Sequence, residues 1–524
     1  MKAIRFIIVF ILSVFFSSCD FLELEPNDFV SAEQYYKTES DLEAALSGVY
    51  STLASGSLYK SYMIGRLGLD ADQGYDNRGT DVGTVSDYNV SPTDVKILKF
   101  WQDLYLGINN ANILLEQINK KEIVMPDSVK QRIVGETLFL RGYFYFLLVS
   151  NFGDVPLVLN SNDSSQPFRT PALQVYDKII QDMDSAALKV NDISALGFGG
   201  RVTKSVVYGI LTRVHLFVAG IPYNQHDHYE KARLCAKTVI DLNFHKLNSN
   251  FQQVFINYAQ DIYDTKESLW EVEFYGNGIG LYANLGGYVG GNNGIRNTFD
   301  LTLGYTYDFI NVTAFAYNVY KTGDLRRDFT IAPFYYKQPT VPAQKVNWSS
   351  TQIFNRNCGK FRREYETLEP KHRSYTPQNF PLLRYSDVLL MYAEAVNAVN
   401  NGPTTEAYDA INQVRRRGFG KDISTPEPTI DLSGLDYDGF LAEVQNERSR
   451  ELAFECLRKG DLVRWGIFFP KMKKCLEDAN AAPTFTDLKL AKSTFTNVSA
   501  RDVVWPIPSY EIGVNPNLTQ NNGW

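Results

Sequence analysis

The chain has 524 residues and a formal net charge of -7, from 52 Lys and Arg against 59 Asp and Glu. This acidic balance argues against nucleic acid or an anionic membrane face as a partner, since both favour basic surfaces. Aromatic residues make up 14% of the sequence, which suits either a large packed core or a recognition surface of rings with polar edges.

The N-terminal segment indicates export. Two basic residues precede an apolar run that ends at Phe16, and two serines and Cys19 follow. A membrane-spanning helix needs about 20 apolar residues, so we interpret 1–18 as a signal peptide that is removed. The four residues up to Cys19 resemble a bacterial lipobox, which makes Cys19 the predicted lipid attachment site. A soluble periplasmic protein with a chance cysteine is the alternative.

An acidic segment follows the predicted anchor. Residues 19–30 carry several carboxylates and Pro26 and have little apolar surface, so we predict a tether that does not fold by itself. It is similar to the acidic export tag that brings some Bacteroidetes lipoproteins to the outer face of the cell. The remaining chain, 31–524, is predicted to form a single domain.

Apolar residues at three- and four-residue spacing predict most of the helices. The predicted helices are 93–119, 127–150, 203–219, 228–241, 384–400, 405–417 and a late helix that includes 443–454. Trp101 falls on an apolar stripe and is predicted to be core. Helix pairs with short turns are typical of tetratricopeptide-type units. The fold class is therefore mainly α, with a helical scaffold mainly in 93–242 and 384–465.

Two long segments lack a helical period and are rich in Gly, Asn, Asp, Tyr and Thr: 60–92 and 275–380. Long irregular segments within a domain usually carry function. We expect them to form ordered loops and short hairpins on a separate ligand face.

Catalytic motifs are missing from the sequence. It contains no GxSxG, HExxH, P-loop or GxGxxG pattern, and we predict no enzyme activity, no cofactor and no metal site. His226 and His228 flank Asp227 and could touch a metal, although a solvated loop is the simpler interpretation. A glycosidase needs only two carboxylates, but nothing in the sequence selects such a pair. Four cysteines beyond Cys19 show no CxxC spacing; one disulfide is possible, with its pairing open.

Three glutamates recur at four-residue steps in the late helix: Glu447, Glu451 and Glu455. A catalytic set would need substrate access and separated pKa values. A buried ion network needs only nearby partners such as Arg415 or Arg464. We favour the network.

Several segments match one family in order. They are 136–145, NFGDVPL at 151–157, GRVTK at 200–204, LRYSDVLLMYAEA at 383–395, 447–465, WPIP at 505–508 and 515–521. Together with the lipobox, they resemble the SusD/RagB family of Bacteroidetes nutrient-uptake lipoproteins. The resemblance implies an α-helical repeat fold, an outer-membrane location facing the cell exterior, and a SusC-like TonB-dependent barrel as partner, over which the lipoprotein closes as a lid. Family substrates are usually glycans, and the RagB branch is associated with peptides.

The two loop regions supply the predicted ligand contacts. A sugar ring stacks its apolar face on aromatic rings and presents hydroxyls to Asp, Asn and Arg. The predicted ligand-binding residues are Asp72, Tyr75, Asp76, Arg78, Tyr282, Tyr288, Asn292, Asn293 and Arg296. Trp348 is a further loop aromatic. For each, a packed aromatic or a turn-forming side chain is the alternative. Glycan binding for an importer is the leading hypothesis; a peptide-binding lid and a docking subunit with little ligand affinity are the others.

Overall fold

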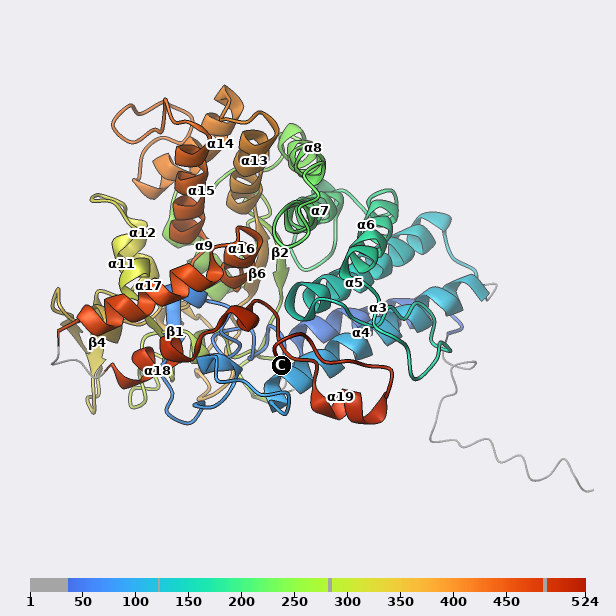
Figure 1. Cartoon of the computed structure of the whole chain (residues 1–524), viewed down its shortest axis with the longest axis horizontal. Helices are drawn as coiled ribbons and strands as arrows, with labels where there is room; N and C mark the ends of the chain where they lie inside the picture. The colour runs from blue at the N-terminus through green and yellow to red at the C-terminus, as the bar shows by residue number, and fades with distance from the viewer. Residues whose placement is uncertain (1–35, 121–122, 281–284, 484–487) are drawn as a thin grey trace, which may run out of the picture.

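The computed structural model describes residues 36–120, 123–280, 285–483 and 488–524. The predicted signal peptide, the tether with Cys19, and Tyr282 lie outside the described residues. Of the described chain, the largest part is helical (Figure 1). The predicted mainly α fold class is confirmed.

The helices of the first half pack against one another in chain order (Figure 1). They are α3 (Glu39–Ser51), α4 (Val95–Lys120), α5 (Asp127–Phe152), α6 (Ala172–Ala187), α7 (Lys204–Ala219) and α8 (His228–Asp241). The predicted bounds of α4, α5, α7 and α8 are right to within two residues. Apolar periodicity identified these helices, because each buries a continuous stripe against its neighbours.

The second half adds another helical group. Its longer helices are α9 (Phe251–Gln260), α13 (Tyr385–Val399), α14 (Thr405–Gly418), α15 (Tyr437–Glu451), α17 (Phe468–Ala481) and α18 (Lys489–Asn497), and its short ones are α10 (Val289–Asn292), α11 (Ala314–Asn318), α12 (Arg326–Thr330), α16 (Arg458–Arg464) and α19 (Ser509–Val514). α13 packs on α8 and joins the two halves. α15 begins earlier than predicted and ends at Glu451, so Glu455 lies beyond it. We did not predict α3, α6, α9, α17 and α18.

Short antiparallel strand pairs accompany the helices. The strands are β1 (Gly74–Asp76), β2 (Ser268–Val272), β3 (Ile310–Val312), β4 (Phe334–Lys337), β5 (Gln344–Asn347) and β6 (Phe380–Arg384). β1 pairs with β3, with Tyr75 opposite Asn311, and this pair ties the two loop regions together. β4 and β5 form a hairpin, as expected for 275–380.

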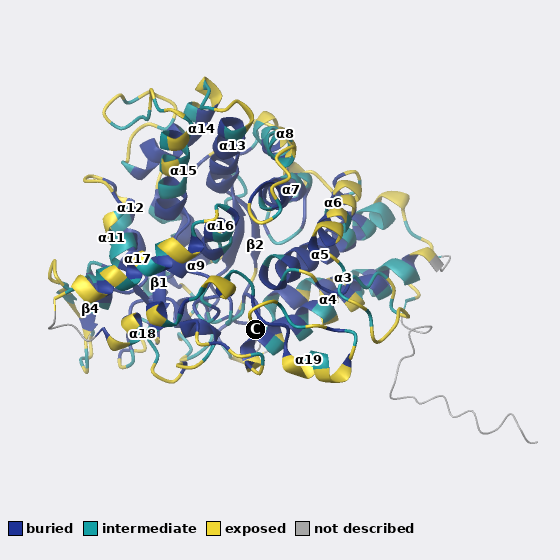
Figure 2. Cartoon of the chain, viewed as in Figure 1, coloured by how far each residue is buried: buried dark blue, intermediate teal, exposed yellow. Residues whose placement is uncertain are grey.

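The main core lies between the helices, whose inward faces are buried (Figure 2). α5 is long and apolar enough to cross a membrane, but 83% of its most apolar window is buried within the protein, so it serves as a core helix. Trp101 is 3% exposed, which confirms its predicted core position. A smaller core joins the first loop region to α16, α17 and α18 through residues that include Tyr75, Tyr88 and Phe468.

The cysteines of the described chain are free thiols: Cys235, Cys358, Cys456 and Cys475. Burial raises the pKa of Cys235 and of Cys358 to about 12. The structure therefore does not realise the disulfide that the sequence left possible.

Candidate functional site

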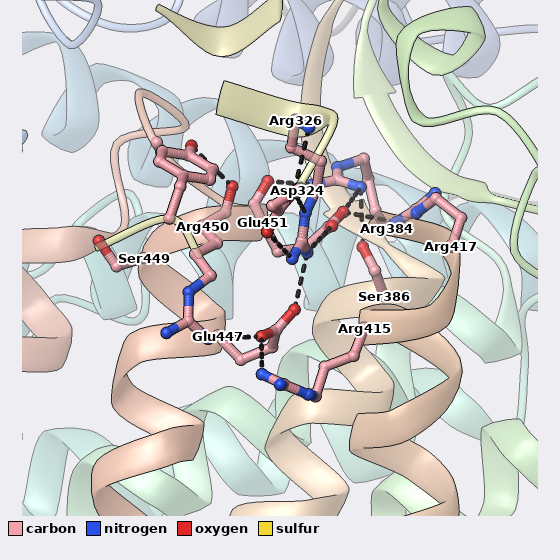
Figure 3. Close-up of polar contacts among 12 residues, drawn as sticks. Asp324, Arg326, Arg384, Ser386, Arg415, Arg417, Glu447, Ser449, Arg450 and Glu451 are labelled. Carbon is pink, nitrogen blue, oxygen red and sulfur yellow. Dashed lines mark hydrogen bonds and ion pairs between the residues drawn. The ribbon is translucent and has the colours of Figure 1, made fainter. Parts of the chain in front are cut away.

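Glu447 and Glu451, on α15, lie in a buried ion network (Figure 3). Glu451 pairs with Arg417 at 2.6 Å, Arg384 at 2.8 Å and Arg326 at 3.1 Å, and all four side chains are fully buried. Burial alone would raise the pKa of Glu451, but Arg417, Arg384 and Arg326 outweigh it and hold that pKa well below its usual range. Glu451 is therefore a permanent anion without solvent access.

Its two companions are enclosed in the same way. Glu447 pairs with Arg326 at 2.7 Å, Arg450 at 2.9 Å and Arg415 at 3.1 Å. Glu455 pairs with Lys360 at 2.6 Å and with Arg384 at 2.8 Å. Catalysis would need substrate access, so the structural interpretation is confirmed, including Arg415 as a partner. Arg464 is not one: it pairs with Asp461 at 2.8 Å and with Glu394.

The predicted contact residues of the first loop mostly face inward. Both carboxylate oxygens of Asp72 accept hydrogen bonds from Arg458, at 2.7 and 2.9 Å, and the residue is 1% exposed. The Tyr75 hydroxyl donates to the Phe354 carbonyl at 2.8 Å from within the smaller core. We therefore remove Asp72 and Tyr75 from the candidate binding surface, because their side chains hold the loop to the scaffold.

The next residues of this loop lie closer to the surface. Asp76 is buried and accepts a hydrogen bond from the Arg78 backbone at 2.8 Å, and burial together with Asp81 raises its pKa to about 7. The Arg78 guanidinium lies 4.0 Å from the Phe309 ring centroid and 3.2 Å from Asp81. Arg78 is half-buried and is the most accessible of the four predicted residues in this loop.

The second loop places its predicted residues at different depths. Tyr288 is half-buried, and its ring centroid lies 5.5 Å from that of Tyr375. Asn292 is buried and donates to the Ser61 carbonyl at 3.3 Å. Asn293 is 1% exposed, too deep for ligand contact. The Arg296 side chain is 58% exposed and lies 3.5 Å from Asp308.

An open depression of about 540 Å³ lies where the two loop regions meet. Its aromatic wall consists of Tyr62, Tyr288, Tyr307 and Phe309, and its polar lining includes Ser61, Arg66, Lys99, Asp103 and Asn292. We call it the tyrosine depression. It brings two of the predicted residues, Tyr288 and Asn292, together with side chains that the sequence analysis did not single out.

The lining of the tyrosine depression contains two cationic side chains, Arg66 and Lys99, and one carboxylate, Asp103. Arg66 packs its guanidinium 4.9 Å from the Tyr62 ring centroid and 5.7 Å from that of Phe309, and it lies 3.4 Å from Asp81. Lys99 is exposed at the rim, whereas Asp103 accepts a hydrogen bond from Ser57 at 2.7 Å. The arrangement offers apolar ring faces next to donors, which suits a ligand with an apolar face and a hydroxylated edge.

A second depression of about 390 Å³ contains Arg296 of the predicted set. Four asparagines, Asn77, Asn311, Asn355 and Asn357, line it together with Asp308, Tyr335 and Trp348. We call it the asparagine depression. Trp348, noted in the sequence as a loop aromatic, packs its ring 4.3 Å from that of Tyr335.

Several residues that line the depressions lie within the predicted loop regions but were not among the predicted contacts. Tyr62 and Arg66 lie near the start of the first loop region, where no sequence motif distinguishes them. Tyr305, Tyr307 and Phe309 alternate at two-residue spacing, a signal that could have identified an aromatic surface in an extended segment.

His228, one of the two histidines considered as a metal contact, pairs with another histidine ring. His228 begins α8, and its Nδ1 lies 2.9 Å from Nδ1 of His215, so one ring donates and the other accepts. Burial and the neighbouring His228 lower the pKa of His215 to about 3, which keeps it neutral. Within the described residues, no group of three or more His, Cys, Asp or Glu is arranged to hold a metal ion.

Comparison with known proteins gives consistent relatives along the chain. Residues 244–524 match the family model described as the SusD family, and residues 20–216 match one described as starch-binding and associating with the outer membrane. A SusD-like protein of Formosa agariphila is 27% identical, with 99% of both chains covered. The second description supports association with the outer membrane.

Solved structures give the same result. A SusD homologue from Bacteroides thetaiotaomicron has a TM-score of 0.87 at 26% identity, covering 94% of this chain and 99% of its own. A laminarin-binding SusD-like protein has a TM-score of 0.71 at 22% identity, covering 93% and 100%, a likeness of fold alone. Because the first family model covers more than half of the sequence, the chain belongs to the SusD family.

Proposed function

We propose that this protein binds glycan at the cell surface without cleaving it and delivers it to a SusC-like TonB-dependent transporter in the outer membrane. Family membership supports the proposal, as do the starch-binding description of the N-terminal family model and the laminarin-binding relative of the same fold. Lipid attachment at Cys19 and an outward orientation are part of the proposal and rest on the lipobox and the acidic segment.

The observation that carries the proposal is the lining of the tyrosine depression. Tyr288, Tyr307 and Phe309 present ring surface beside Arg66 and Asn292 in an open hollow. A sugar ring can stack on such rings while its hydroxyls meet the polar groups, and stacking tolerates several sugar types. The fully paired carboxylates of the ion network offer nothing comparable to a ligand.

Calorimetry with a panel of oligosaccharides tests this function. We expect saturable binding to at least one glycan, weakened about tenfold or more by Tyr288→Ala, because the ring supplies buried apolar contact area. Tyr510→Ala is the matched control, since Tyr510 is 58% exposed on α19 and does not line the depression. Equal loss in both variants, or none in Tyr288→Ala, would contradict the assignment.

The other interpretations give different results in the same assay. Heats with peptide mixtures and none with any glycan would indicate a peptide-binding lid. No heat with either ligand class, together with copurification of a barrel, would indicate a docking subunit. Shortened products after long incubation with a bound glycan would show catalysis and overturn the non-catalytic part of the proposal.

A further inference from the structure

The asparagine depression adjoins the tyrosine depression along one short segment. Tyr307 and Phe309 line the tyrosine depression, whereas Asp308, between them, lines the asparagine depression. Asp308 has a φ of 54°, a left-handed conformation that Asp tolerates better than most residues. Because consecutive residues serve both hollows, a chain-like ligand that crosses residues 307–309 would contact both.

The carboxyl group of Asp308 is buried with weak partners. Asp308 is 5% exposed, and its nearest donors are Asn357 at 3.3 Å and Asn77 and Arg296 at 3.5 Å. A carboxylate normally accepts charge-assisted hydrogen bonds of about 2.7–2.9 Å. Burial raises the pKa of Asp308 to about 7, because these distant donors compensate it incompletely. A ligand hydroxyl would supply the short hydrogen bond that the described residues do not.

An aromatic pair stands at the same depression. Tyr335 of β4 and Trp348, directly after β5, have ring centroids 4.3 Å apart and planes inclined by 37°. Nε1 of Trp348 and Oδ1 of Asn355 are buried without a hydrogen-bond partner in the described part of the chain. Buried polar atoms are almost always paired, so these two, lining an open hollow, are further groups that a ligand could satisfy.

We propose that the asparagine depression is a second sugar-binding position, which takes an uncharged residue of the same glycan chain that occupies the tyrosine depression. This rests on the proposed function. Trp348 and Tyr335 would carry the apolar face of the sugar, and Asp308 and the surrounding amides would bind its hydroxyls, since an amide offers both donors and acceptors.

The balance of charge favours an uncharged sugar here. Arg296 and Asp308 are the charged side chains that line this depression, and they face each other at 3.5 Å. Its other polar groups are amides and aromatic edges. A carboxylated or sulfated sugar would lie against Asp308, and its charge would be desolvated with a single exposed arginine as partner.

A length series of one glycan that binds through Tyr288 tests the proposal by calorimetry. In the wild-type protein, we expect affinity to rise about tenfold or more from oligosaccharides that fill one depression to those that fill both. Trp348→Ala and Asp308→Asn should each remove most of that rise and leave the short oligosaccharides unaffected. Tyr510→Ala is again the control. Trp348→Ala could disturb the β4–β5 hairpin. Asp308→Asn keeps the shape of its side chain and therefore tests the proposal independently of the hairpin.

The outcomes separate the two proposals. An unchanged length dependence in both variants would overturn the second position while leaving glycan binding at the tyrosine depression intact. Saturable heat with Ca²⁺ alone, lost in Asp308→Asn, would overturn it in favour of a cation site. If no oligosaccharide of any length binds the wild-type protein, the proposed function fails, and the second position fails with it.

Discussion

The ion network of α15 and the two depressions both contain carboxylates and arginines, but they differ in how completely these groups are paired. Glu451 makes three ion pairs of 2.6–3.1 Å with no exposed side chain among them. Asp308 meets its donors at 3.3–3.5 Å beside an open hollow. Charged residues close together in space therefore do not by themselves mark a binding site. The proposed second sugar position rests instead on incomplete pairing next to an open hollow.

Breaking the network should give the largest effect on stability. Glu451→Gln keeps the side-chain volume but leaves Arg384, Arg417 and Arg326 with excess buried positive charge. Removing one partner of a buried ion pair costs about 3–5 kcal/mol, and we expect a loss of that size in the free energy of unfolding, measured by urea denaturation.

Glu443 provides the matched control on the same helix. Its side chain is 22% exposed and lies 3.5–3.6 Å from Arg450 and Arg415, so Glu443→Gln should cost less than about 1 kcal/mol. If the two variants lost equal stability, the distinction between fully buried and partly exposed ion pairs would be wrong for this helix.

Glu271 is a buried carboxyl group that forms no ion pair with a cation among the described residues. Burial and then the neighbouring Glu273 raise the pKa of Glu271, on β2, to about 8. Because the folded pKa lies above the unfolded value, the folded protein binds the extra proton between about pH 4.5 and 8. With respect to this group, the folded protein is therefore more stable at low pH, where Glu271 is protonated. This stability is lost as pH rises through the window, because the buried Glu271 must then ionise.

Glu271→Gln should remove this part of the pH dependence. We expect the variant to match the wild-type protein near pH 5 and to exceed its stability at pH 8, by an amount on the order of a few kcal/mol. Thermal unfolding at the two pH values measures the difference. A variant that is equally destabilised at both would show that the Glu271 carboxylate is stabilised in the folded state.

The sequence predicts the helical scaffold well because the information is local. Apolar spacing and end signals such as Gly220 set the bounds of α4, α5, α7 and α8 within two residues. α17 was not predicted, although its buried residues Phe468, Met472, Cys475 and Ala479 recur at three- and four-residue spacing. Its apolar stripe is narrow and packs largely on α18, the next helix.

The candidate site is predicted by region more than by residue. Both loop regions line the depressions, and Tyr288, Asn292 and Arg296 are among the lining residues. Asp72 and Tyr75 are not, because their partners are remote: Arg458 lies 386 positions from Asp72, and Phe354 lies 279 positions from Tyr75. Composition indicates that a loop is polar and aromatic, but only the three-dimensional contacts show which of its side chains hold the scaffold.

Two arginines differ in the same way as Glu451 and Asp308. Arg296 and Arg326 each pair with a carboxylate, but Arg326 is fully buried among three of them, whereas the Arg296 side chain is 58% exposed and has one at 3.5 Å. An exposed pair of this geometry contributes little, because water competes for both charges. Arg296→Ala should change the free energy of unfolding by less than about 0.5 kcal/mol in urea denaturation. A loss above about 2 kcal/mol would mean that Arg296 stabilises the scaffold. Pairing distance and exposure would then not separate structural charges from those that line the depressions.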